Sequence, residues 1–271
     1  MRDPQSAEPG ETSSRPVIIP EEQRHLFREV LRLFEDDHIP FAVAGAFALH
    51  AHTGISRDTK DLDIFLTSEN TGPAMRSLER RGFTCEVCDP VWLFKVRRDG
   101  FFVDLITGMS NAVFVVDDSW IERARPADVL GVRTRVLGAD ELLLSKLFVT
   151  RRERFDGADI AHIVYGTRGQ LHWQYLLSAV GEHWEVLFWA LVLFRYCYPA
   201  QTHFVPLKVW CELIGRYQQA VTNPEPDTRF RGSLIDEKMF AIDVNEWELD
   251  NLVDEFRQRR LQTVHEQKKS A

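Results

Sequence analysis

The chain has 271 residues, 44% of them hydrophobic and 27% charged, with a formal net charge of −8 at pH 7. This length and composition are ordinary for a globular protein with a sizeable core. The acidic balance argues against an extended nucleic-acid footprint, although Arg151, Arg152 and Arg154 form a local basic cluster. No apolar run approaches the roughly 20 residues that span a bilayer, so we expect no membrane partner.

The N-terminal segment is polar and mixed in charge, which predicts a disordered tail over residues 1–20 rather than a signal peptide. The four cysteines are too few and too scattered for a disulfide framework. Cys85 and Cys88 form a lone C-x-x-C pair without the further ligands of a closed zinc site, which favours reduced thiols over zinc. We therefore expect a reducing, cytoplasmic compartment.

Helices and strands alternate in the first half of the chain. The spacing of Leu26, Val30, Leu33 and Phe34 predicts a helix over 21–37. The pattern then predicts strands over 41–44, 61–67, 83–87, 91–96 and 101–106, and helices over 46–52 and 73–81. Asp99-Gly100 is a strong signal for a hairpin turn between the last two strands.

The second half is predicted to be mainly helical. An apolar helix over 139–150, with Asp140 as its N-cap, begins this part. Further helices are expected over 158–165, 173–180, 184–196, 207–220 and 247–264, with a late strand over 240–244. The fold class is thus α+β: a core over 21–138, built on a small mixed sheet with helices on one side, followed by a mainly helical C-terminal domain over 139–271.

Three aspartates carry the chemistry of this core. Asp61 and Asp63 are two apart on a strand and share one face, and Asp104 lies between apolar neighbours on another strand. If the two strands are adjacent, the carboxylates converge and repel one another unless a cation binds. Mg²⁺, with Mn²⁺ as an alternative, suits such oxygen ligands and could hold the reacting oxygens of a phosphoryl transfer. The alternative is that these are strand-end residues in surface salt bridges.

The segment before the first aspartate suits a nucleotide. Gly45-Ala46 lies where a strand gives way to a helix, so backbone N–H groups could meet phosphate oxygens; otherwise it is a tight turn only. Arg57 and Thr59 lie on the loop that enters the Asp61 strand and are also predicted to bind the nucleotide. Arg57 would donate hydrogen bonds from two guanidinium nitrogens to the triphosphate; otherwise it would pair with Asp58 or face solvent.

These residues resemble the nucleotidyltransferases of the polymerase-β-like superfamily, and especially minimal nucleotidyltransferases and abortive-infection-type toxin nucleotidyltransferases. The resemblance covers about residues 35–165, and Ala46 departs from the usual Gly or Ser. It implies transfer of a nucleoside monophosphate from a nucleoside triphosphate, such as ATP, to an acceptor hydroxyl on a small molecule, a transfer RNA or a protein. Asp61 and Asp63 would bridge two metal ions, and Asp104 would hold the one nearer the acceptor.

The resemblance also implies roles for Lys146 and for Asp156 and Asp159. Lys146 would contact a phosphate, or be a helix lysine that snorkels to water. The two aspartates would lie near the active site, or else be capping carboxylates at a helix N-terminus.

Other interpretations are a glycosyltransferase, which needs more nucleotide-binding sheet before the Asp-x-Asp motif, and a catalytically degenerate protein that binds a partner, as toxin–antitoxin modules do.

Overall fold

The computed structural model describes residues 19–270, with backbone only for 267–270. The predicted disordered tail over 1–20 therefore lies almost wholly outside the described residues. Ile19, the first of them, is buried and leads into the first helix.

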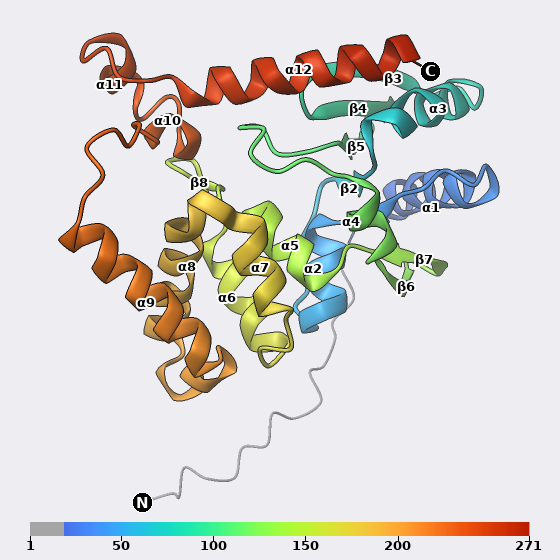
Figure 1. Ribbon diagram of the computed structural model, residues 1–271. Helices are drawn as coiled ribbons and strands as arrows, with labels where there is room; N and C mark the ends of the chain where they lie inside the picture. The colour runs from blue at the N-terminus through green and yellow to red at the C-terminus, as the bar shows by residue number, and fades with distance from the viewer. Residues whose placement is uncertain (1–18, 271) are drawn as a thin grey trace, which may run out of the picture.

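A mixed sheet of seven strands forms the core, in the order β3-β4-β5-β2-β1-β7-β6 (Figure 1). The strands are β1 Ala42–Val43, β2 Leu62–Phe65, β3 Thr84–Asp89, β4 Leu93–Arg98, β5 Phe101–Ile106, β6 Arg125–Val129 and β7 Val132–Val136. β2 pairs with β5 and β1 with β7 in parallel, whereas β1 and β2 are antiparallel. The predicted α+β class with a mixed sheet is confirmed.

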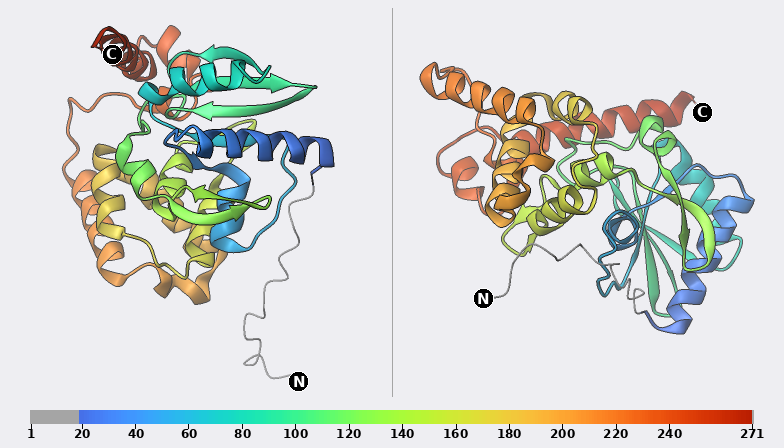
Figure 2. Two further views of the ribbon diagram at one scale, coloured as in Figure 1. Left: turned by 90° about the vertical axis from the view of Figure 1, so that its right-hand side faces the viewer. Right: turned by 90° about the horizontal axis from the view of Figure 1, so that it is seen from below.

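The helices of the first half bury the sheet. α1 (Glu21–Asp36) and α3 (Ser68–Glu79) pack against each other, α1 contacts β5 and β7, and α3 contacts β3. α2 (Gly45–Thr53) contacts β2 and β7 as well, so helical packing is more extensive than the predicted single layer. In the right-hand view of Figure 2, α1 (blue) and the yellow and orange helices of the second half lie on opposite sides of the sheet.

The second half is mainly helical, as predicted. It contains α5 Ala139–Lys146, α6 Gly157–Gly166, α7 Trp173–Val180, α8 Trp184–Cys197, α9 Leu207–Thr222, α10 Gly232–Ile235, α11 Ala241–Asn245 and α12 Leu252–Ser270. Two 3₁₀ turns, Gly181–His183 and Pro199–Phe204, and a hairpin of β8 Thr150–Arg151 and β9 Arg154–Phe155 connect them. Buried apolar residues of both halves form one continuous cluster, and the predicted division at residue 138 stays a prediction.

Several local predictions were wrong. The predicted strand over 240–244 is helix α11, because the Asp236 carboxylate accepts from the N–H groups of Lys238 and Met239 and turns the chain away from any strand partner. The N-cap of α5 is Gly138, and the Asp140 carboxylate instead accepts from the backbone N–H of His172 at 2.8 Å.

Boundaries also differ from the sequence analysis. α3 begins at Ser68, which leaves Pro73 inside the helix, and α5 ends at Lys146 because the chain then forms the β8–β9 hairpin. No element was predicted over β6 and β7, which form a hairpin at the edge of the sheet, or over α4 (Asp118–Glu122). Neither cysteine of the C-x-x-C pair forms a disulfide; Cys85 is half-buried and Cys88 exposed on β3.

One stretch, Trp173–Cys197, is long and apolar enough by length and composition to cross a membrane. A helix of this kind is weak support for a membrane span, because core helices of globular proteins pass the same test. Here the stretch is divided into α7 and α8 by the turn at Gly181, whose φ is +50°. Leu176, Leu187 and Phe194 on its inner side are fully buried.

The docking of α1 can be tested at Phe34, which is fully buried and packs edge-to-face on Phe41 with ring centroids 5.4 Å apart. Phe34→Ala should lower the free energy of unfolding by about 3–5 kcal/mol, because it leaves a cavity beneath the helix. Arg32→Ala, at an exposed position of the same helix, should change it by less than about 0.5 kcal/mol. Urea unfolding measures both, and a cost for Phe34→Ala as small as that of the control would contradict this packing.

Candidate active site

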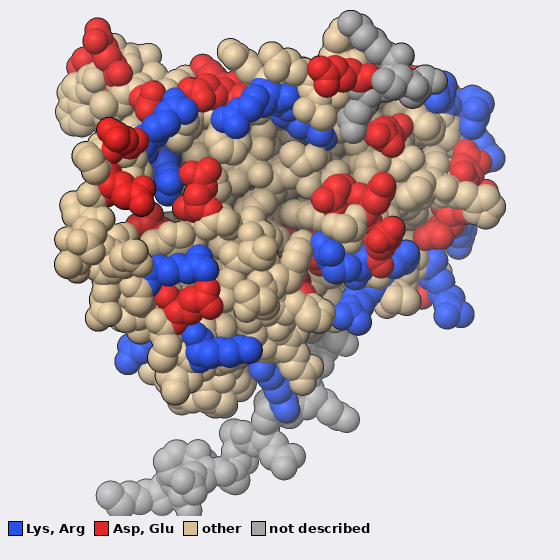
Figure 3. Space-filling model, in the orientation of Figure 1, with Lys and Arg blue, Asp and Glu red and all other residues tan. Residues whose placement is uncertain are grey.

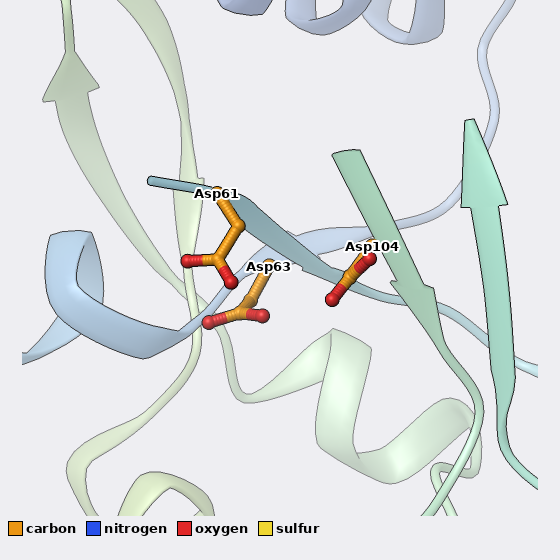
Figure 4. A group of neighbouring side chains, drawn as sticks. All are labelled: Asp61, Asp63 and Asp104. Atoms are coloured by element: carbon orange, nitrogen blue, oxygen red, sulfur yellow. The ribbon is translucent and has the colours of Figure 1, made fainter. Parts of the chain in front are cut away.

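The sheet register brings the three predicted aspartates together. Asp63 on β2 lies directly beside Asp104 on the parallel strand β5, and Asp61 lies two residues before Asp63, just ahead of β2. One carboxylate oxygen from each residue lies within 4.8 Å of the others. Figure 4 shows the three side chains turned toward the same space. Asp104 is buried, and Asp61 and Asp63 are half-buried.

Gly45 lets the first turn of α2 approach the trio. Its φ of +54° is in the left-handed region, which disfavours any residue with a Cβ. A Cβ at this position would also overlap the carboxylate of Asp63. The backbone of Ala44, one residue earlier, donates its N–H to the Asp63 carbonyl at 2.8 Å. The N-terminus of α2, which has no side-chain cap, therefore begins directly beside Asp63.

Mutual repulsion and burial determine the protonation of the trio in the absence of a cation. Burial, followed by the charges of Asp61 and Asp104, raises the pKa of Asp63 to about 7. Burial also raises the pKa of Asp104, although a hydrogen bond and the charge of Lys95 partly offset the effect. The folded protein thus disfavours having all three carboxylates ionised.

Lys95 is a neighbour of the trio that the sequence analysis missed. It lies opposite Asp104 in the antiparallel β4–β5 pair, and its Nζ donates to Asp104 Oδ1 at 2.5 Å. A signal for it was present in the sequence. A two-residue turn at Asp99-Gly100 fixes the register of the hairpin, and counting back from the turn places residue 95 opposite residue 104.

Lys146, the last residue of α5, is buried and does not snorkel to water. Its Nζ pairs with Asp156 at 2.9 Å and with Asp159 at 2.7 Å. Its positive charge lowers the pKa of Asp63, as does that of Arg154. Lys146 thus belongs to the electrostatic surroundings of the trio.

The other residues singled out in the sequence join this network. Asp156 makes no capping hydrogen bond at α6. Burial alone would raise its pKa, but hydrogen bonds and charges from Arg154 and Lys146 outweigh burial and lower it. Arg57 pairs with Asp159 rather than with Asp58.

Thr59 and Ala46, two predicted nucleotide-binding residues, lie close to the trio because each is near one of its neighbours in the sequence. The hydroxyl of Thr59 donates to Oδ1 of Asp61 at 3.0 Å and orients that carboxylate. Ala46 follows Gly45 in the first turn of α2. The structure therefore brings Gly45, Ala46 and Thr59 beside the aspartates, and places Arg57 and Lys146 in an ion-pair network on α6.

The mixed sheet carries Asp61 and Asp63 at β2 and a third aspartate on the adjacent parallel strand, and the chain as a whole is that of a nucleotidyltransferase enzyme. Residues 23–180 match the family described as nucleotidyl transferase of unknown function (DUF2204), and the chain belongs to this family.

Three solved structures that are similar to this chain share less than 20% sequence identity with it. One is an antigenic nucleotidyltransferase-like protein from Paracoccidioides brasiliensis, at 16% identity and a TM-score of 0.43, covering 70% of this chain and 96% of that one. Another is the antibiotic-resistance factor ANT(2'')-Ia, at 15% identity and a TM-score of 0.42, covering 68% and 97%. A putative nucleotidyltransferase from Thermotoga maritima is 16% identical, with a TM-score of 0.41, covering 51% and 90%. No curated protein matches the sequence.

The close approach at Gly45 is testable against a matched glycine. Gly45→Ala should lower the free energy of unfolding by about 1–3 kcal/mol more than Gly82→Ala does, because it overpacks the Asp63 carboxylate. Gly82 has a similar positive φ of +79° but nothing within 4 Å of an added Cβ, so it reports backbone strain alone. Urea unfolding of both variants compares the two costs, and equal costs would show that residue 45 does not press on Asp63.

The raised pKa of Asp63 predicts a dependence of stability on pH. With a pKa of 3.8 when unfolded and about 7 when folded, Asp63 favours the folded state at low pH. That contribution is lost as the pH rises through 7. Between about pH 5 and pH 8 in a chelator, the wild type should lose roughly 2–3 kcal/mol more stability than Asp63→Asn. Identical pH profiles of the two proteins, measured by urea unfolding, would refute the assignment.

Proposed function

We propose that this enzyme transfers a nucleoside monophosphate from a nucleoside triphosphate to an acceptor hydroxyl, with release of pyrophosphate, and that it requires a divalent cation. The observation that carries the proposal is the convergence of three carboxylate oxygens within 4.8 Å of one another, beside the uncapped N-terminus of α2. Family membership supports nucleotidyl transfer in general. The cation and the acceptor hydroxyl are additions of the proposal.

The residues present fit a hard divalent cation. The donors are carboxylate oxygens only, which Mg²⁺ and Mn²⁺ prefer. Burial, followed by the charges of Asp61 and Asp104, raises the pKa of Asp63, and the positive charges of Lys146 and Arg154 do not offset it. Asp61, Asp63 and Asp104 would hold the cation through their carboxylate oxygens. When bound, a cation of this kind stabilises negative charge on the transferring phosphoryl group.

The chain's own groups would orient the triphosphate. Backbone N–H groups at Gly45 and Ala46 are directed outward at the start of α2, where the helix dipole favours phosphate oxygens. Lys146 and Arg57 are cations whose current partners, Asp156 and Asp159, are carboxylates that a phosphate could replace. Thr59 would keep Asp61 oriented through its hydroxyl.

In the proposed reaction, the acceptor oxygen forms a bond to the α-phosphorus while the bond from that phosphorus to the pyrophosphate oxygen breaks. The hydroxyl proton passes to a carboxylate oxygen of Asp104, and the pyrophosphate leaves with the electron pair. Because little covalent chemistry falls to the protein, positioning and charge compensation would supply most of the rate enhancement.

The proposal specifies the acceptor only as a hydroxyl group, which would belong to a small molecule, a transfer RNA or a protein. The C-terminal helices α6 to α8 lie next to the ion-pair network of Lys146 and would shape the acceptor pocket. All four cysteines are free thiols, which is in keeping with a reducing, cytoplasmic compartment.

The roles of the aspartates can be tested by replacement. Asp61→Asn and Asp63→Asn should each reduce transfer of labelled nucleotide from a nucleoside triphosphate at least about 10²-fold, because each removes charge stabilisation at the reacting phosphoryl group. Asp58→Asn, at an exposed position on the same loop, should retain activity. Transfer would be measured with Mg²⁺ or Mn²⁺ and a panel of acceptors, and full activity of both site variants would rule out the mechanism.

The same variants distinguish an active enzyme from the alternative, a catalytically degenerate protein that binds a partner. Ala46, which departs from the usual Gly or Ser, is the reason for considering this alternative. A nucleoside triphosphate at about a hundred times its dissociation constant should stabilise the wild type by roughly 2.7 kcal/mol with Mg²⁺, and the aspartate variants much less. If no nucleoside triphosphate stabilises the wild type and a protein partner is captured in stoichiometric amount, the catalytically degenerate alternative is favoured.

A further inference from the structure

The last helix, α12, is fastened to the sheet by two arginines in different electrostatic situations. Arg257 donates to both carboxylate oxygens of Asp89, at 3.1 and 2.9 Å, and to the carbonyl of Ser110 at 2.7 Å. Its charge is therefore compensated. Arg260, one turn further along the same face, donates from one nitrogen to the hydroxyl of Ser68.

Arg260 is buried without a counter-ion. Its residue surface is only 9% exposed, and its Nε has no hydrogen-bond partner in the part of the chain that the structure describes. Among the described residues no carboxylate forms an ion pair with it, and burial alone accounts for the lowering of its pKa. An arginine keeps its charge in proteins, so a buried and unpaired guanidinium costs several kcal/mol.

The position of Ser68 increases this imbalance. Ser68 is the first residue of α3, a helix of 12 residues whose N-cap, Thr67, makes no side-chain cap. The N-terminus of a helix carries partial positive charge and unsatisfied N–H donors. A buried cation is therefore held against the positive end of a helix.

We propose that Arg260 and the first turn of α3 form a binding site for a phosphate-type oxyanion. The guanidinium presents several N–H donors that match a tetrahedral oxyanion, and the first turn of a helix has backbone N–H groups without intrahelical partners that favour a negative charge. Ser68 accepts from Arg260, so its own hydroxyl proton is available to the anion.

This site is separate from the proposed catalytic trio. Ser68 begins α3 on the far side of the end of β2 at Phe65, whereas Asp63 lies within β2 and Asp61 just before it. It lies where α12 contacts α3, and Figure 3 shows Lys and Arg side chains along the top of the molecule, where α12 runs, with Asp and Glu beside them. Bound oxyanion would neutralise Arg260 and fasten α12, and with it the C-terminal half, to the sheet.

The test compares Arg260→Met with Arg257→Met, a matched change one turn away. In chloride buffer without phosphate, Arg260→Met should melt at or above the wild-type temperature, because it removes an uncompensated buried charge. Arg257→Met should melt lower, because it leaves Asp89 unpaired. Inorganic phosphate at about ten times its dissociation constant should raise the melting temperature of the wild type and of Arg257→Met by roughly 3–5 °C over chloride of equal ionic strength. Arg260→Met should show no such rise.

Two further arms complete the experiment. Methyl phosphate in place of inorganic phosphate distinguishes a free anion from a phosphate ester: an equal shift means that the site accepts esters, and a lost shift means that it takes the free ion. Ser68→Ala, which keeps Arg260, should reduce the phosphate shift. The proposal is overturned if phosphate shifts Arg260→Met as much as the wild type, if it shifts neither protein, or if Arg260→Met is destabilised in chloride.

Discussion

Three carboxylates held within 4.8 Å of one another repel, and much of the architecture around β2 and β5 compensates for that repulsion. The positive groups come from separate parts of the chain: Lys95 from the neighbouring strand, Lys146 from the end of α5 and Arg154 from the β8–β9 hairpin. Even so, burial and the charges of Asp61 and Asp104 keep the pKa of Asp63 near 7, so these positive groups do not fully offset burial and repulsion. This remaining deficit is the electrostatic reason why the site suits a divalent cation.

The same balance links the sheet to the helical half. Lys146 is buried between the two carboxylates of α6, and Asp159 also holds Arg57 on the loop that leads into β2. One carboxylate of α6 therefore ties together α5 and the loop before the aspartate pair. One oxygen of Asp159, Oδ1, is buried without a hydrogen-bond partner. Since a buried unpaired oxygen costs free energy, this oxygen could accept a hydrogen bond from a further donor.

The aspartates could be predicted from the sequence because their arrangement depends on short-range rules. Alternation along a strand places Asp61 and Asp63 on one face, and apolar neighbours identify Asp104 as the odd polar residue of its strand. The adjacency of the two strands was a condition in that argument, and the parallel pairing of β2 with β5 meets it. The mainly helical second half was also foreseen, because periodic apolar spacing is a strong signal.

What could not be predicted depends on contacts between segments far apart in the chain. The segment 240–244, expected to be a strand, is a helix, and among the described residues no strand lies beside it for pairing. The sequence of five residues does not indicate whether a partner strand is present. The partners of Lys146 and Arg57 follow from how α6 packs on α5, which local patterns do not specify.

Arg257 and Arg260 show the limit most clearly. Both lie on a charged helix whose sequence reads as a solvated surface, and both are on the side that faces the protein. Asp89, the last residue of β3, compensates one of them, whereas Ser68 supplies only a neutral hydroxyl to the other. A protein gains nothing from burying an unmatched charge against the positive end of a helix unless a negative group is bound there for part of its working life. Arg257 has a counter-ion and Arg260, one turn away, has none among the described residues. We therefore place the proposed bound anion at the start of α3, where α12 contacts it.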